Sequence, residues 1–156
     1  KAKMSKSLGN CIYLSDSADE IKTKVMNMFT DPTHLCVKDP GHVEGNPVFI
    51  YLDAFSRPEH FAAFLPEYAN LDELKAHYTR GGLGDVKVKR FLNEVIQAEL
   101  KPIRERRADW ESRLPDVYEI LRAGCFTAES RAAGTLADVR RAMRIDYFEN
   151  GNLLNG

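Results

Sequence analysis

An apolar stripe in the second half of the chain constrains its fold more than any other feature. After Asp85, apolar side chains recur at intervals of three and four residues: Val88, Phe91, Leu92, Val95, Ile96, Leu100 and Ile103. At 100° per residue their directions cluster within about half a turn. The opposite side carries polar and charged residues: Lys87, Arg90, Glu94, Gln97, Lys101 and Arg104. The pattern predicts a long amphipathic helix that Pro102 kinks or loosens, because proline removes a backbone donor.

Cap and stop residues predict further helices on both sides of this one. Ser17 and Glu20 fit a capping box, which predicts a helix over residues 17–30. Asn46-Pro47 is typical of an N-cap followed by a first-turn proline, and it predicts a helix through Phe55. More helices are expected at 58–68, at 71–80, at 116–131 and after a cap at Thr135. No segment alternates apolar and polar residues as a strand does, so the predicted fold class is all-α, a helical bundle.

Composition excludes several classes of protein. The 156 residues include 22 Lys and Arg against 23 Asp and Glu, for a net charge of -1. A uniformly basic coat for nucleic acid is excluded, whereas a locally basic face is not. No run approaches the roughly 18 apolar residues of a membrane span. The three cysteines, Cys11, Cys36 and Cys125, are too few for a disulfide framework. We therefore expect a soluble protein of the cytoplasm, with no membrane partner.

The first residues carry the most specific chemistry. Lys3, Met4, Ser5, Lys6 and Ser7 place two ammonium groups and two hydroxyls on one short loop. Lysine supplies a point charge with three donors, and serine supplies short neutral donors, so such a loop can surround a polyphosphate. The alternative is an ordinary solvated loop of lysines and serines.

The five-residue run resembles the KMSKS signature of class I aminoacyl-tRNA synthetases, with a match at every position. Its surroundings are similar to the C-terminal part of the bacterial tryptophanyl-tRNA synthetase family. The similar strings are Ile12 to Asp16, Glu20 to Val25, Phe29 to Pro32, Asp39 to Gly41, Asn46 to Phe49 and Gly81 to Lys87. The resemblance covers residues 1 to about 148.

The resemblance implies an enzyme that activates L-tryptophan with ATP and Mg²⁺ and transfers it to tryptophan tRNA. It implies that Lys3, Met4, Ser5, Lys6 and Ser7 bind ATP. Lys3 and Lys6 would be the catalytic residues, with Lys6 on the leaving pyrophosphate. Residues 1–15 would form this loop at the edge of a Rossmann-type catalytic domain, 16–148 an anticodon-binding helical domain, and 149–156 a flexible tail.

The family's remaining catalytic signatures lie upstream of the residues present here. The chain is therefore expected to be a C-terminal fragment that is inactive without the missing N-terminal catalytic half. Dimerisation of the full-length homodimer is implied to reside largely in that half.

Basic residues in two regions are the candidates for contact with tRNA. The candidates are Lys87, Arg90, Lys101, Arg104, Arg140, Arg141 and Arg144, with Lys89, Arg106, Arg107 and Arg131 adding charge nearby. Stacking of bases would need aromatic surfaces such as Tyr118, Phe126 or Tyr147. The alternative is that these cations lie on solvated helix faces among Glu94, Glu99 and Glu105.

The cysteines, histidines, aromatic residues and methionines are expected to have structural rather than catalytic roles. No metal site is expected, since Cys11 and Cys36 lack the second pair of thiolates that an iron-sulfur cluster needs. Cys125 is expected in the core, and the four histidines at surfaces or interfaces. The aromatic and methionine residues are expected mostly to pack: Met26, Met28, Phe29, Phe49, Phe55, Phe61, Phe64 and Trp110.

Two other interpretations of the chain stay open. One is a free-standing helical module that binds RNA or a partner and keeps the loop as a relic. The other is a fragment of a different class I synthetase, tyrosyl or methionyl.

Overall fold

Helices make up all the regular structure in the part of the chain that the computed structural model describes, residues 6–147. They are η1 (Lys6–Leu8), α1 (Ala18–Met26), α2 (Pro47–Phe55), α3 (Pro58–Phe64), α4 (Leu71–Arg80), α5 (Asp85–Ser112) and α6 (Leu114–Met143). The predicted all-α class is confirmed for these residues. The chain divides into two compact units, residues 1–107 and 108–156, and the boundary falls inside α5.

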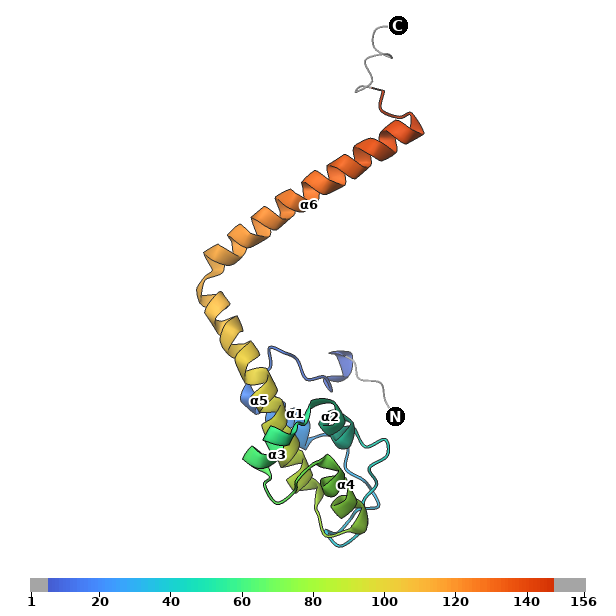
Figure 1. Cartoon of the computed structure of the whole chain (residues 1–156), viewed down its shortest axis with the longest axis vertical. Coiled ribbons are helices and arrows are strands. Elements are labelled where there is room, and N and C mark those ends of the chain that lie inside the picture. The colour runs from blue at the N-terminus through green and yellow to red at the C-terminus, as the bar shows by residue number, and fades with distance from the viewer. Residues whose placement is uncertain (1–5, 148–156) are drawn as a thin grey trace. The chain divides into compact units, whose positions relative to one another are not determined.

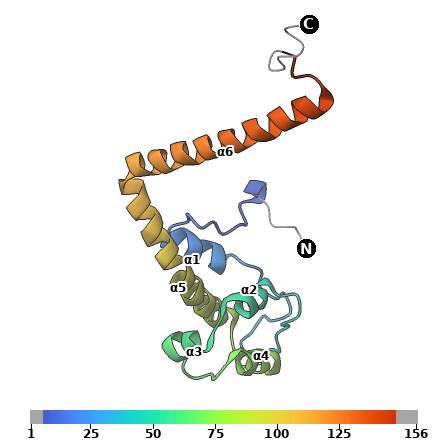
Figure 2. The same ribbon diagram turned by 45° about the horizontal axis from the view of Figure 1, so that its top comes forward.

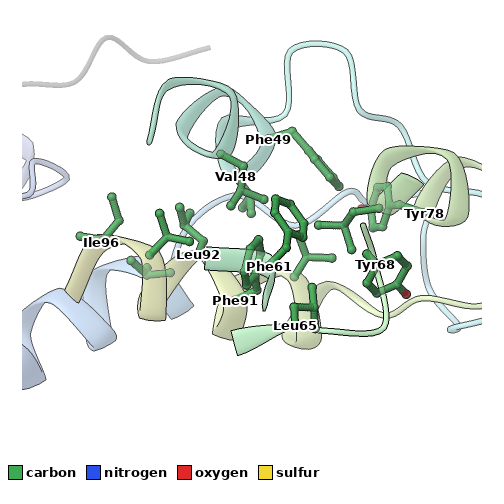
Figure 3. Close-up of a cluster of buried hydrophobic side chains, with 14 of the residues drawn as sticks. Val48, Phe49, Phe61, Leu65, Tyr68, Tyr78, Phe91, Leu92 and Ile96 are labelled. Atoms are coloured by element: carbon green, nitrogen blue, oxygen red, sulfur yellow. The ribbon is translucent and has the colours of Figure 1, made fainter. Parts of the chain in front are cut away.

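The core of the first unit forms where α1, α2, α3 and α4 pack around the first part of α5 (Figure 1, Figure 2). The predicted stripe supplies this surface: Val88, Phe91, Leu92, Val95 and Ile96 are all at most 4% exposed. Side chains from α2, α3, α4 and α5 point toward one another there (Figure 3). Burying one such side chain contributes about 1.5–3 kcal/mol, so this contact area outweighs any single polar interaction in the unit.

A buried lysine interrupts the apolar stripe. Lys89 is 4% exposed, and its Nζ donates to the carbonyls of Met26 and Met28, at 3.1 and 2.7 Å, and to Oγ1 of Thr30, at 2.7 Å. The last carbonyls of a helix lack partners within the helix, and a cation satisfies them. α1 accordingly ends at Met26, before the predicted limit of residue 30. Grouping Lys89 with the exposed basic residues was wrong.

The segment from residue 31 to residue 46 has no helix, but hydrogen bonds fasten it. Asp31, 5% exposed, accepts from the backbone N–H and Oγ1 of Thr33 and from the backbone N–H of His42, at 2.9, 2.6 and 3.0 Å. Gly41 N–H donates to the carbonyl of Tyr78, and Gly82 N–H to the carbonyl of Val37. These bonds tie the segment to α4 and to the turn before α5.

The predicted break between residues 131 and 135 does not exist, because α6 runs unbroken from Leu114 to Met143. Thr135 does not cap a new helix, since its Oγ1 donates to the carbonyl of Arg131 within the same helix, at 3.1 Å. α5 likewise continues through Pro102 to Ser112. No residue of α6 is buried, and Cys125 is exposed, so its predicted place in the core was wrong.

Membrane-spanning capacity is absent among the described helices, none of which is both long and apolar enough to cross a bilayer.

Removing the charge of Lys89 is expected to destabilise the first unit. Lys89→Met keeps the apolar stem but leaves the carbonyls of Met26 and Met28 without their donor, which costs about 1–3 kcal/mol. Urea unfolding measures the change. Lys101→Met, at an exposed position of the same helix, is the matched control and should change stability little. Equal unfolding midpoints for the two variants would contradict the role given to Lys89.

Acid is expected to lower the free energy of unfolding, in part because Asp31 becomes protonated. The hydrogen bonds from Thr33, followed by those from His42, hold the pKa of the Asp31 carboxyl well below its usual range. A carboxylate whose pKa is lowered by folding adds stability above its unfolded pKa of about 4, and this stability is lost as the pH falls below that value. The urea midpoint should therefore fall more steeply between pH 5 and pH 3 in the unaltered chain than in Asp31→Asn. If the urea midpoints of the two proteins fell in parallel with pH, Asp31 would not contribute to the loss of stability in acid.

Candidate ATP loop and nucleic-acid interface

The predicted ATP loop lies at the edge of the described residues. Lys3, Met4 and Ser5 fall outside residues 6–147, whereas Lys6 and Ser7 begin η1, where Ser7 is exposed. Gly9 follows η1 with φ of 63°, a left-handed conformation that favours glycine. The geometry that can be described is therefore that of the loop's C-terminal root.

The root is the segment of residues 10–16, which we call the strap. Ile12 of the strap packs against the core of the first unit. Oδ2 of Asp16 accepts from Tyr13 N–H at 2.7 Å and pairs with Nζ of Lys24, on α1, at 2.6 Å. The same Nζ lies 4.6 Å from the centre of the Tyr13 ring. These contacts join the strap to the helix that follows it.

Asp16 is charged despite its burial. Only 6% of the residue is exposed, and burial alone would raise the pKa of its carboxyl. The hydrogen bonds from Lys24 and from the backbone N–H of Tyr13 outweigh this effect, so the pKa lies below its usual value. Sequence reasoning missed the pair, because neither the capping box at Ser17 nor the family-like strings around it predict a contact between Asp16 and Lys24.

The basic candidates on α5 form two groups. Lys87 and Arg90 lie about 14 residues before Lys101 and Arg104, which corresponds to about 21 Å along a helix. Lys87, Arg90 and Lys101 are exposed, and Arg104 is half-buried. Lys87 pairs with Glu67, and Arg104 donates to Oε1 of Gln97 at 2.8 Å. Nζ of Lys101 lies 3.9 Å from Oε1 of Glu105. Three of the four therefore have partners in the chain with which RNA phosphates would compete.

The basic candidates on the second unit lie near the end of α6. Arg140, Arg141 and Arg144 are exposed, as are the aromatic side chains Tyr118, Phe126 and Tyr147, which are 69%, 72% and 56% exposed. Arg141 pairs with Asp138 at 3.1 Å, and Arg144 ends the helix in the left-handed conformation. Cations and aromatic surfaces are thus both available here for phosphates and unstacked bases.

Two of the four histidines contradict the expectation of surface positions. His34 and His60 are each 6% exposed. Nδ1 of His34 lies 2.8 Å from Oδ2 of Asp85, while the hydroxyl of Tyr78 donates to Oδ1 of the same carboxylate at 2.8 Å. Burial, followed by this hydrogen bond, raises the pKa of Tyr78. The group anchors the segment of residues 31–46 to the start of α5.

Several aromatic side chains expected to pack are exposed instead: Phe29 by 52%, Phe55 by 41% and Phe64 by 40%. Phe55 borders an apolar groove of about 300 Å³ between α2, α5 and the strap, whose lining includes Ile12, Leu14 and Leu100. The strap, which is the root of the candidate ATP loop, thus forms one wall of this apolar groove. Phe49 and Phe61 are buried as predicted.

A metal site is not formed by the described side chains. Among residues 6–147, no group of three or more His, Cys, Asp or Glu residues is placed to hold a metal ion. Cys36 is exposed and Cys11 is half-buried.

Comparison with known proteins assigns the family. The model of the family described as tRNA synthetases class I (W and Y) matches residues 1–101. A tryptophan–tRNA ligase of Clostridium longisporum is 57% identical over 150 residues, which are 96% of this chain and 41% of that protein. The tryptophan–tRNA ligase of Lactococcus lactis is 51% identical over 148 residues, again covering 41% of its length. The chain thus spans about two fifths of the curated relatives it matches.

Solved structures agree with this assignment. A crystal structure of tryptophanyl-tRNA synthetase from Campylobacter jejuni matches with a TM-score of 0.73 and 27% identity, over 91% of this chain and 42% of that one. A second structure of the same enzyme, complexed with ADP and tryptophan, matches with the same TM-score over 41% of its chain. The KMSKS run, the helical fold and these similarities converge: the chain belongs to the class I tRNA synthetases of the tryptophan and tyrosine group.

Proposed function

We propose that the chain works as the C-terminal part of a cytoplasmic tryptophan–tRNA ligase, in which it supplies the ATP loop and a helical surface for tRNA. The observation that carries the proposal is the unbroken run from Lys3 to Ser7 in a chain 57% identical to a tryptophan–tRNA ligase. Because the two relatives compared above in sequence are tryptophan enzymes, a tyrosyl or methionyl enzyme is the weaker interpretation.

The loop's role follows from its chemistry. In adenylate formation the carboxylate of tryptophan attacks the α-phosphorus of ATP, and the bond from that phosphorus to the bridging oxygen breaks. Negative charge then develops on the leaving pyrophosphate. Ammonium groups aimed at it stabilise the transition state more than bound ATP, which raises the rate of the chemical step. Lys6 is assigned to this leaving group, and Lys3, Met4, Ser5 and Ser7 to binding of ATP with its Mg²⁺. The Campylobacter enzyme, solved with ADP and tryptophan, supports an adenine nucleotide and tryptophan as ligands of the full-length ligase.

The remaining parts of the reaction are assigned to protein outside this chain. The described residues offer no nucleotide-binding sheet, and tryptophan and most of the ATP molecule would be held by the N-terminal catalytic half. The full-length ligase is proposed to be a homodimer. This chain alone is accordingly proposed to be inactive.

Contacts with tRNA are proposed separately for each unit: Arg90 on α5 in the first unit, and Arg140, Arg141 and Arg144 at the end of α6 in the second. Their exposure supports contact with phosphates, and the exposed rings on α6 support stacking of anticodon bases. Lys87, Lys101 and Arg104 are proposed as secondary contacts, since all three already have partners within the chain.

Lys6→Ala in the full-length ligase is expected to slow tryptophan-dependent exchange of pyrophosphate into ATP by about a hundredfold or more, because one stabilising cation is removed from the transition state. Tryptophan binding, measured by equilibrium dialysis, should change little. Ser7→Ala is a milder companion variant at the same loop. Equal loss of tryptophan binding and of exchange would show that Lys6 does not act on the leaving group.

Binding of this chain to tryptophan tRNA tests the proposed RNA surface directly. We expect preference for the native anticodon over an anticodon variant, with affinity that falls steeply as salt rises. Arg140→Ala should weaken binding and reduce the slope of log affinity against log salt by about one unit for each phosphate that the variant no longer binds. Arg122→Ala is the matched control on α6, where Arg122 pairs with Glu119 at 2.8 Å.

Weak binding that ignores the anticodon would count against a working anticodon surface on this chain. Equal effects of Arg140→Ala and Arg122→Ala would remove Arg140 from the contact surface.

A further inference from the structure

We propose that the pair of Asp16 and Lys24 is a latch that sets the position of the ATP loop, and that Lys24 is a positioning residue for departure of pyrophosphate. The inference rests on the proposed function of the loop. Lys24 touches the strap and Asp16, and it acts on the reaction through them.

The latch joins the turn of residues 13–16 to α1 through several contacts. Oδ2 of Asp16 receives both the backbone N–H of Tyr13 and the Nζ of Lys24, at 2.7 and 2.6 Å. Asp16 N–H in turn donates to the carbonyl of Tyr13 at 3.1 Å, which makes a turn of residues 13–16. The Tyr13 ring lies against the ammonium group of Lys24. Asp16 therefore holds the backbone of Tyr13, while Lys24 contacts the Tyr13 ring and pairs with Asp16.

The pair differs from an ordinary surface ion pair in its exposure. The side chain of Asp16 is 8% exposed and that of Lys24 is 24% exposed. Exposed pairs have small effects because water screens them, whereas partly desolvated pairs with additional hydrogen bonds hold their geometry more firmly. The latch therefore restrains the position of the strap.

Chain length links the latch to the chemistry. Lys6 lies seven residues before Tyr13, so it stays within about 25 Å of the latch even in a fully extended chain. Residues 7–17 connect Lys6 to α1, and the contacts of Ile12 with the core and of Tyr13 in the latch fix the far end of this connection. A misplacement of about 1 Å at a reacting group can cost about a hundredfold in rate. Loss of the latch would therefore affect the rate of adenylate formation more than the binding of tryptophan.

The first experiment measures pyrophosphate exchange by the full-length ligase carrying Lys24→Met, Lys24→Arg or Lys22→Met. Lys22 is exposed on the same helix and serves as the control. We expect Lys24→Met to lower kcat by about tenfold or more with KM for tryptophan unchanged. Lys24→Arg, which keeps the charge, should recover most of the rate. If Lys24→Met and Lys22→Met had the same kcat, the proposed latch would be refuted.

A double-mutant cycle with Lys6→Ala separates positioning from general loss of structure. If Lys24 acts through the loop lysine, adding Lys24→Met to Lys6→Ala should lower kcat little further. Losses that simply multiply would overturn the proposal. Should Lys24→Met fail to fold, as judged by urea unfolding, Lys24→Gln and Asp16→Asn carry the same test.

The two proposals fail in different ways. A full-length protein without tryptophan-dependent exchange in its unaltered form would refute the proposed function. An active unaltered protein in which every latch variant matches the control would refute the latch alone.

Discussion

The packing of four helices on the first part of α5 is the constraint on which the first unit depends. The residues that define this surface are almost completely inaccessible to water, and they meet side chains from α2, α3 and α4 in one core. Polar side chains of the same helix make further contacts. Asp85 at its start binds Tyr78, and Lys89 one turn later binds the end of α1. The apolar contact supplies the stability, and the polar contacts fix which loops lie where.

The sequence was most informative where a pattern is local. The spacing from Val88 to Ile96 and the caps at Ser17 and Asn46 each depend on residues a few positions apart, so the helices they predict exist. Thr135 was misleading for the same reason: its local preference for a cap position predicted a new helix, whereas α6 is continuous there and Thr135 donates to the carbonyl of Arg131. Lys89 could not be placed from its neighbours. Its partners lie at least 59 residues away, and only the folded chain brings them together.

The sequence predicted which residue types form the candidate site, but not how their side chains are arranged. The run from Lys3 to Ser7 predicts a loop that binds a polyphosphate, because its composition and order are specific, and this role stays a prediction. The strap and the pair of Asp16 and Lys24 carry no comparable signature, and they emerge only when α1 and the preceding residues are seen together. For the basic residues, the helical pattern predicted position on a helix but not pairing. Glu67 beside Lys87 comes from a different part of the chain.

The long-range contact of Lys89 has a consequence for the order in which the protein becomes structured during synthesis. Its partner carbonyl at Met26 precedes it by 63 residues. At about 5–20 residues per second, a ribosome takes about 3–13 s to add that interval. The end of α1 is therefore made well before the residue that satisfies its carbonyls, and it gains that support only after α5 has followed.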